Sequence, residues 1–175
     1  MPKNSIENVT TLTFDIFGTV LDLAGSLIPP LDNLLKECSN AENLKGADVW
    51  AQWRLRQRIE QYQDNLYMLG HSGYLPVKRR ALIYSLRNLK VEFNYNQVDD
   101  FMEAYQNLSP FPDAIEGLNR LSKKYNLVML SNGEQNYLEH LAKIELSLNL
   151  MIFYPQKQLV NLNLILLFIV LPLKN

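Results

Sequence analysis

Two runs of strand-forming residues, far apart in the chain, constrain its fold most. The first is Val9 to Phe17 (VTTLTFDIF), in which β-branched and aromatic residues predominate before a Gly-Thr turn. The second is Leu127 to Leu130 (LVML), which the turn residues Ser-Asn-Gly close. Each run predicts a buried strand that ends in polar residues.

Helical periodicity dominates the sequence between these two strands. Apolar residues recur at helical spacing at Leu82, Leu86 and Leu89, and again at Val98, Phe101, Met102 and Tyr105. Pro112 and Asp113 are suited to starting a further helix before the second strand. We therefore expect residues 26–106 to form a mainly helical insertion.

This order of elements predicts an α/β fold with a Rossmann-like core, a parallel sheet with flanking helices, and an inserted helical cap. We expect the core in residues 1–25 and 107–148, the cap in residues 26–106, and an aberrant apolar tail in residues 149–175. Ligands of such sheets bind beyond the carboxyl ends of the strands. Asp15 and Ser131 would both lie there.

Composition excludes some classes of function. The 175 residues carry a net charge of -1 and 47% of them are hydrophobic, which gives no electrostatic reason to expect nucleic acid. The one cysteine, Cys38, is expected to be a reduced thiol. The N-terminus, MPKNSIENVT, does not resemble a secretory signal, so we expect a cytoplasmic protein.

Asp15 stands in a specific setting, TFDIFGTVLD. This segment resembles the first motif of the haloacid dehalogenase superfamily, in which that aspartate is the nucleophile. The chain is most similar there to the (S)-2-haloacid dehalogenases (haloacid dehalogenase type II). An aspartate is ionised at neutral pH in water and can form an ester without a partner base. The resemblance implies catalytic roles for Asp15 and Thr19.

Phe17, two residues after Asp15, separates two branches of this superfamily. Its phosphatases resemble DxDxT, and their second aspartate protonates a poor leaving group. A halide leaves without protonation, so Phe17 is compatible with dehalogenation. Phosphatases of this type also use Mg²⁺, and Phe17 adds no ligand, so neither a metal nor another cofactor is expected.

Two further segments resemble the same family. The LSNG sequence at Leu130 resembles the second motif, which implies that Ser131 binds the substrate carboxylate or the nucleophile and that Asn132 helps hold the departing halide. Alone, this sequence is an ordinary turn. The segment WRLRQRIEQY resembles the WRxxQ sequence of 2-haloacid dehalogenases, which implies that Arg54 binds the halide. The family resemblance of the first motif likewise implies that Phe17 lies beside the substrate. Its three arginines are equally typical of a solvated helix face.

The tail departs from the family. Gln158 to Leu173 contains no charged residue, whereas 20% of the whole chain is charged. Back-translating Leu150 to Leu166 and reading from the third base of each codon permits the string DDILSAEAVGKFKPDP. Phe153 followed by Tyr154, for example, forces Leu in that frame. The string matches the family segment SAExVGxxKPDP, which carries the third-motif lysine, so we expect a frameshift near residues 145–149.

A membrane anchor is the alternative explanation of the tail. A membrane-spanning helix needs about 20 apolar residues, and this run is shorter and contains Asn161 and Asn163. We therefore expect no membrane association. The resemblance would then cover Val9 to Leu146, in a chain truncated at the C-terminal part of the core.

The sequence predicts hydrolytic dehalogenation of a small 2-haloacid through an aspartyl ester. A superfamily phosphatase or phosphonatase and a non-catalytic remnant are the alternatives. The intact version is expected to form a homodimer. The chain as written lacks the third-motif lysine and later strands, so we expect poor folding and little activity.

Overall fold

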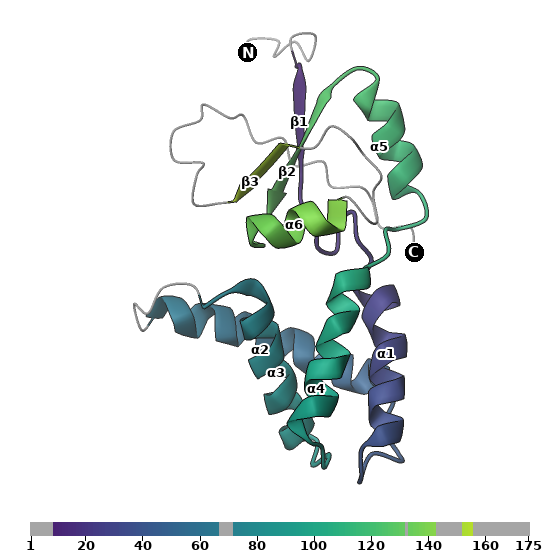
Figure 1. The fold of residues 1–175 in the computed structure, drawn as a ribbon, viewed down its shortest axis with the longest axis vertical. Helices are drawn as coiled ribbons and strands as arrows, with labels where there is room; N and C mark the ends of the chain where they lie inside the picture. The colour runs from purple at the N-terminus through teal and green to yellow at the C-terminus, as the bar shows by residue number, and fades with distance from the viewer. Residues whose placement is uncertain (1–8, 67–71, 132, 143–151, 156–175) are drawn as a thin grey trace, which may run out of the picture.

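The structure of the protein, a computed structural model, describes residues 9–66, 72–131, 133–142 and 152–155. The strands and helices, in chain order, are β1 (Thr11–Phe14), α1 (Leu23–Glu37), α2 (Gly46–Leu66), α3 (Tyr74–Asn88), α4 (Tyr95–Met102), the 3-10 helix η2 (Glu103–Asn107), α5 (Ala114–Ser122), β2 (Asn126–Ser131), α6 (Gln135–Leu141) and β3 (Ile152–Pro155). Figure 1 shows the strands with α5 and α6 at one end of the molecule and α1 to α4 at the other.

The strands form a parallel sheet in the order β1-β2-β3. Thr11 is opposite Asn126 and Phe14 is opposite Met129, so the carboxyl ends of β1 and β2 lie at the same sheet edge. The predicted α/β class with a parallel sheet and flanking helices is confirmed.

The third strand, β3, is an addition to the two that the sequence analysis predicts. It lies inside the tail of residues 149–175 and pairs with β2, with Ser131 opposite Pro155. Isoleucine, phenylalanine and tyrosine favour strands whatever the origin of the segment, which explains why it can pair here. The rest of that tail is outside the described residues.

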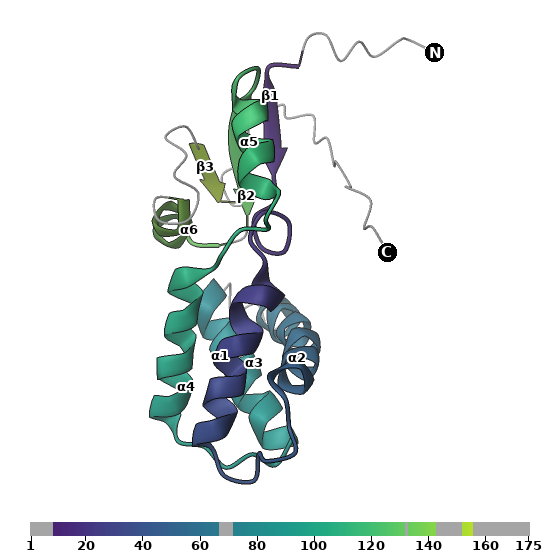
Figure 2. The ribbon, with the colours of Figure 1, turned by 90° about the vertical axis from the view of Figure 1, so that its right-hand side faces the viewer.

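Residues 23–107, from α1 to η2, form a unit that we call the helical module (Figures 1 and 2). Within it α2 packs on α1 and α3, and α4 packs on the same two helices. Its first helix begins at Leu23 because Asp22 caps α1, its carboxylate accepting a hydrogen bond from the backbone N–H of Gly25 at 2.9 Å.

The helix predicted around Val98 is divided into two pieces. Asn94 and Gln97 form a capping box that starts α4, and the chain tightens after Met102 into η2. Such 3-10 turns are frequent at the ends of α-helices. The predicted apolar face is nevertheless buried, since Val98, Phe101 and Tyr105 are all inaccessible or nearly so.

Buried side chains of the sheet and of the helical module form one continuous cluster, which includes Leu12 of β1, Met129 of β2 and Trp53 of α2. The helical module is therefore packed against the part of the chain that carries the sheet, where η2 contacts α6, rather than merely tethered to it. Within the described residues, no helix is both long and apolar enough to cross a membrane.

Candidate active site

The turn after β1 presents Asp15 at the carboxyl end of the sheet. Ile16 is fully buried, and its carbonyl accepts hydrogen bonds from the backbone N–H groups of Thr19, Val20 and Leu21 at 3.3, 3.0 and 2.9 Å. Gly18 has φ +88°, a conformation that favours glycine and that closes this turn. The exposed Asp15 carboxylate receives a hydrogen bond from the Thr19 hydroxyl, with 2.9 Å between Oγ1 and Oδ2.

Ser131 ends β2 at the same sheet edge, because β1 and β2 are parallel and in register. It is 5% exposed, and its Oγ accepts a hydrogen bond from the backbone N–H of Gly133 at 3.3 Å. Asn132, the partner that the sequence predicts for the halide, lies outside the described residues. Neither Ser131 nor Thr19 is among the described residues that line the adjacent cavity.

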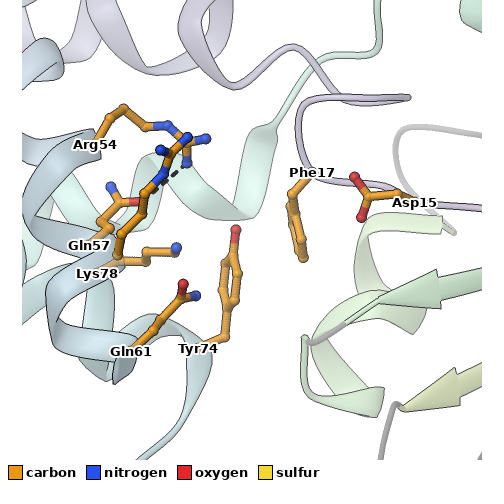
Figure 3. Close-up of a pocket in the computed structure, with 8 residues that line it drawn as sticks. Asp15, Phe17, Arg54, Gln57, Gln61, Tyr74 and Lys78 are labelled. Atoms are coloured by element: carbon orange, nitrogen blue, oxygen red, sulfur yellow. Dashed lines mark hydrogen bonds between the residues drawn. The ribbon is translucent and has the colours of Figure 1, made fainter. Parts of the chain in front are cut away.

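A cavity of about 170 Å³ lies between Asp15 and the helical module. Its lining residues come from the β1 turn, α2 and α3, and they are Asp15, Phe17, Arg54, Gln57, Arg58, Gln61, Tyr74 and Lys78 (Figure 3). Pockets for drug-sized ligands have volumes of roughly 300–1,000 Å³, so this one suits a ligand of few atoms.

Arg54 extends from α2 into this cavity (Figure 3). Its Nη1 donates a hydrogen bond to Gln57 Oε1 at 3.3 Å, and its guanidinium lies 5.4 Å from the centre of the Trp50 ring. The arginine two positions further along, Arg56, instead forms an ion pair with Glu60 at 2.6 Å. The arginines of the WRLRQR segment therefore divide between the cavity and a structural ion pair.

Phe17 forms the wall between Asp15 and the helical module. Its ring stacks on Tyr74 of α3, with 4.4 Å between ring centres and 18° between planes, and on Tyr137 of α6 at 5.9 Å. In Figure 3 Asp15 lies on one side of this stack, and Arg54 and Lys78 lie on the other. Phe17 therefore places an apolar ring two residues after Asp15. This ring joins the turn after β1 to α3 of the helical module and to α6.

The first turn of α3 is fixed to the segment after β2. The backbone N–H of Tyr74 donates a hydrogen bond to Glu134 Oε1 at 2.5 Å. Gly73 precedes it with φ +101°, and a Cβ there would meet the same carboxylate oxygen at 3.0 Å. Glycine at this position allows the close approach of Glu134.

Tyr74 and Lys78 are site residues that the sequence analysis does not predict. Tyr74 is 2% exposed and Lys78 is 3% exposed, and the Lys78 ammonium lies 4.4 Å from the centre of the Tyr74 ring. Burial raises the pKa of Tyr74 well above its ordinary value, so its hydroxyl stays protonated at neutral pH. Burial, followed by the Arg54 charge, lowers the pKa of Lys78 to about 8.

Helical spacing is the signal that could have identified Lys78. It is four residues from both Tyr74 and Leu82, which places it on the buried face of α3, although its neighbours in the KRR run point to a solvated one. Among the described residues, no group of three or more His, Cys, Asp or Glu side chains is arranged to hold a metal ion.

These features define an α/β protein with a carboxylate-centred site between its sheet and an inserted group of helices. The chain belongs to the haloacid dehalogenase-like hydrolase family, whose sequence model matches residues 9–154. The family resemblance of the TFDIFGTVLD segment is thereby confirmed, and the match extends past Leu146.

Similar proteins of this family include (S)-2-haloacid dehalogenases. That of Burkholderia cepacia, dehalogenase 4A, is 30% identical over 139 residues, which are 79% of this chain and 56% of the relative. That of Xanthobacter autotrophicus is 27% identical over 77% of this chain and 49% of the relative. The chain spans about half the length of these curated relatives.

A solved structure of the L-2-haloacid dehalogenase from Xanthobacter autotrophicus has the same fold. It superposes with a TM-score of 0.65 and 26% sequence identity, covering 83% of this chain and 56% of the other. The structural likeness therefore extends over both the helical module and the sheet of the described chain.

Proposed function

We propose that this site performs hydrolytic dehalogenation of a small 2-haloacid. The observation that carries the proposal is the cavity that Asp15 and Arg54 both line, with the apolar Phe17 where a phosphatase would have a second carboxylate. The similarity to (S)-2-haloacid dehalogenases over most of the chain supports it.

The reaction has two steps. An Asp15 carboxylate oxygen attacks C2 of the substrate, the carbon–halogen bond breaks, and the halide departs with the bonding electrons beside the Arg54 guanidinium. Water then adds to the ester carbon of Asp15, releasing the 2-hydroxyacid and a proton and restoring the carboxylate. Thr19 holds the attacking carboxylate, while Ser131 and Asn132 bind the substrate carboxylate and the halide.

The phosphatase alternative is disfavoured by the position of Phe17. Its ring is half-buried against Tyr74 and supplies neither an acid for a leaving alkoxide nor a metal ligand. Assay of the protein with 2-chloropropionate and with an aryl phosphate separates the two activities. Release of inorganic phosphate without chloride would favour the phosphatase.

We further propose that residues 26–106 act as a cap over the site, since α2 and α3 supply most of the residues lining the cavity. A homodimer of the intact protein is part of this proposal. Exposed apolar residues along α2 support it, namely Leu55, Ile59, Tyr62 and Leu66. A cytoplasmic location is also proposed, and light scattering and cell fractionation test these two points.

The frameshift is also a proposal, and the shifted-frame string DDILSAEAVGKFKPDP supports it. Restoring that frame would supply the third-motif lysine and replace the apolar tail. Sequencing the gene across residues 145–149 tests it directly. A continuous reading frame, together with an intact mass that matches the tail as written, would refute it and would favour the non-catalytic remnant.

The central experiment uses the frame-restored protein, meaning this chain with its C-terminal part read in the shifted frame. We expect it to release chloride from 2-chloropropionate, and we expect Asp15→Asn to abolish that release. Asp100→Asn is the matched control because Asp100 is exposed and lies outside the cavity. Full chloride release by Asp15→Asn would refute the proposed mechanism.

A further inference from the structure

We propose that Lys78 forms an anion-binding subsite that accepts the second carboxylate of a short 2-halodicarboxylate, such as 2-chlorosuccinate. The inference rests on the proposed function, because it names the substrate class of that same site. Because Lys78 lies on α3, the helical module would select the substrate by its charge.

Lys78 is a buried cation inside the cavity. Its side chain lies over the Tyr74 ring, and Figure 3 shows its ammonium directed toward the space between Arg54 and Tyr74. Within the described part of the chain, it forms no ion pair and no hydrogen bond through its ammonium. Because a buried ammonium without a counter-ion is costly, an anion that enters the cavity is stabilised there.

Gln57 orders the cation next to Lys78. Its side chain is 2% exposed and lines the same cavity, and its Oε1 accepts the hydrogen bond from Arg54 at 3.3 Å. Its amide group also lies beside the buried Tyr105 hydroxyl, which holds the amide in place. The Arg54 guanidinium is thereby kept at the same cavity as the Lys78 ammonium, and two neighbouring cations are suited to a carboxylate.

The charges around the cavity favour a dianion over a monoanion. Its lining contains three cations, namely the buried Lys78, the half-buried Arg54 and the exposed Arg58, and one exposed carboxylate, Asp15. None of these cations forms an ion pair with a described residue. A monocarboxylate brings one negative charge to the two cations that are shielded from solvent, Arg54 and Lys78, whereas a dicarboxylate brings one charge for each of them.

The packing of α2 against α3 holds the subsite in place. Trp53 is fully buried, and its Nε1 donates a hydrogen bond to the backbone carbonyl of Lys78 at 2.8 Å. This bond fixes the backbone that carries Lys78 beside the turn of α2 that carries Gln57. The cavity volume of about 170 Å³ restricts the ligand to a short diacid.

The test compares succinate with butyrate, which have the same number of carbons but differ by one charge, by calorimetric titration of the 175-residue chain. At pH 7 we expect succinate to bind about tenfold more tightly, since a hydrogen bond to a charged group contributes that much or more. Lys78→Met should remove this preference and leave butyrate binding within about twofold. Lys123→Met, at an exposed lysine outside the cavity, is the matched control.

The pH profile distinguishes a direct contact from a structural role. The titratable and charged groups lining the cavity with Lys78 are Asp15 beyond β1, Arg54 and Arg58 on α2, and Tyr74 on α3. The pKa of Lys78 is about 8. The succinate preference should therefore decline from about tenfold at pH 7 toward equality as the pH rises above 8 and Lys78 loses its charge, whereas the affinity for butyrate should change little.

Equal binding of succinate and butyrate by the unmodified chain would overturn the inference, as would absence of binding by both. A preference that Lys78→Met or pH leaves unchanged would do the same. Failure of the proposed function is a different result, namely no chloride release by the frame-restored protein from either 2-chloropropionate or 2-chlorosuccinate. Dehalogenation without a dicarboxylate preference would refute this inference alone.

Discussion

Phe17 and Tyr74 stack with 4.4 Å between ring centres, and this contact joins the turn that carries Asp15 to the first turn of α3. Tyr137 of α6 adds a third ring, and its hydroxyl donates a hydrogen bond to the backbone carbonyl of Tyr105 at 2.6 Å. Aromatic packing therefore sets how the helical module lies against the sheet, and with it the distance between the nucleophile and the cations across the cavity.

Replacing Tyr74 with alanine should destabilise the fold by about 3 kcal/mol, because a buried aromatic ring is lost and a cavity is left behind. Chemical denaturation followed by circular dichroism measures this change. Tyr62→Ala is the matched control, since Tyr62 is 68% exposed and Tyr74 is 2% exposed. Equal effects of the two substitutions would show that the aromatic stack contributes nothing to stability.

The hydrogen bond between Glu134 and the backbone N–H of Tyr74 gives a second prediction. Glu134→Ala should lower the free energy of unfolding by about 1 kcal/mol, whereas Glu134→Gln, which keeps an acceptor oxygen, should lose less. Glu42→Ala is the control at an exposed glutamate. A glutamine variant as unstable as the alanine variant would argue against this hydrogen bond.

Local pattern predicts much of this fold. The strand around Leu12 and the strand around Val128 both follow from runs of β-forming residues, and the helices between them follow from apolar periodicity. The sequence does not predict the third strand, because residues 152–155 belong to the tail in which the written sequence matches no family motif. Pairing with β2 is a tertiary effect that a local pattern does not contain.

The sequence predicts those site residues that lie in a recognisable family motif. Asp15 and Arg54 were identified from the TFDIFGTVLD and WRLRQR segments, and the structure brings both to one cavity. The sequence does not single out Lys78, because three consecutive cations, Lys78 to Arg80, are more typical of a solvated helix face. Whether a lysine is buried depends on which helix packs over it, and here Trp53 of α2 does so.

Thr19 should orient the nucleophile, because its hydroxyl donates a hydrogen bond to Asp15 Oδ2 at 2.9 Å. In the frame-restored protein, Thr19→Val should lower kcat about tenfold, with a much smaller change in the unfolding midpoint. Thr19→Ser keeps the donor and should restore most of the activity. Chloride release under saturating substrate is the measurement, and equal kcat for the valine and serine variants would contradict this role.

Lys78 makes stability depend on pH. Its pKa falls from 10.5 to about 8 on folding, chiefly through burial. Each pKa unit corresponds to about 1.4 kcal/mol, so charged Lys78 costs the folded state about 3.5 kcal/mol at pH 7. Lys78→Met keeps an unbranched side chain of similar length and removes the charge. It should therefore raise the free energy of unfolding at that pH.

That advantage should shrink as the pH rises. Between pH 8 and 10.5 the unfolded chain still holds the Lys78 proton while the folded chain has lost it, so the unmodified protein gains stability with pH across this window. The difference between Lys78→Met and the unmodified protein should decline from pH 8 and level off above 10.5. Urea denaturation at several pH values measures it, with Lys123→Met as the exposed control. A difference that stays constant from pH 7 to 11 would mean that Lys78 keeps its ordinary pKa in the folded chain.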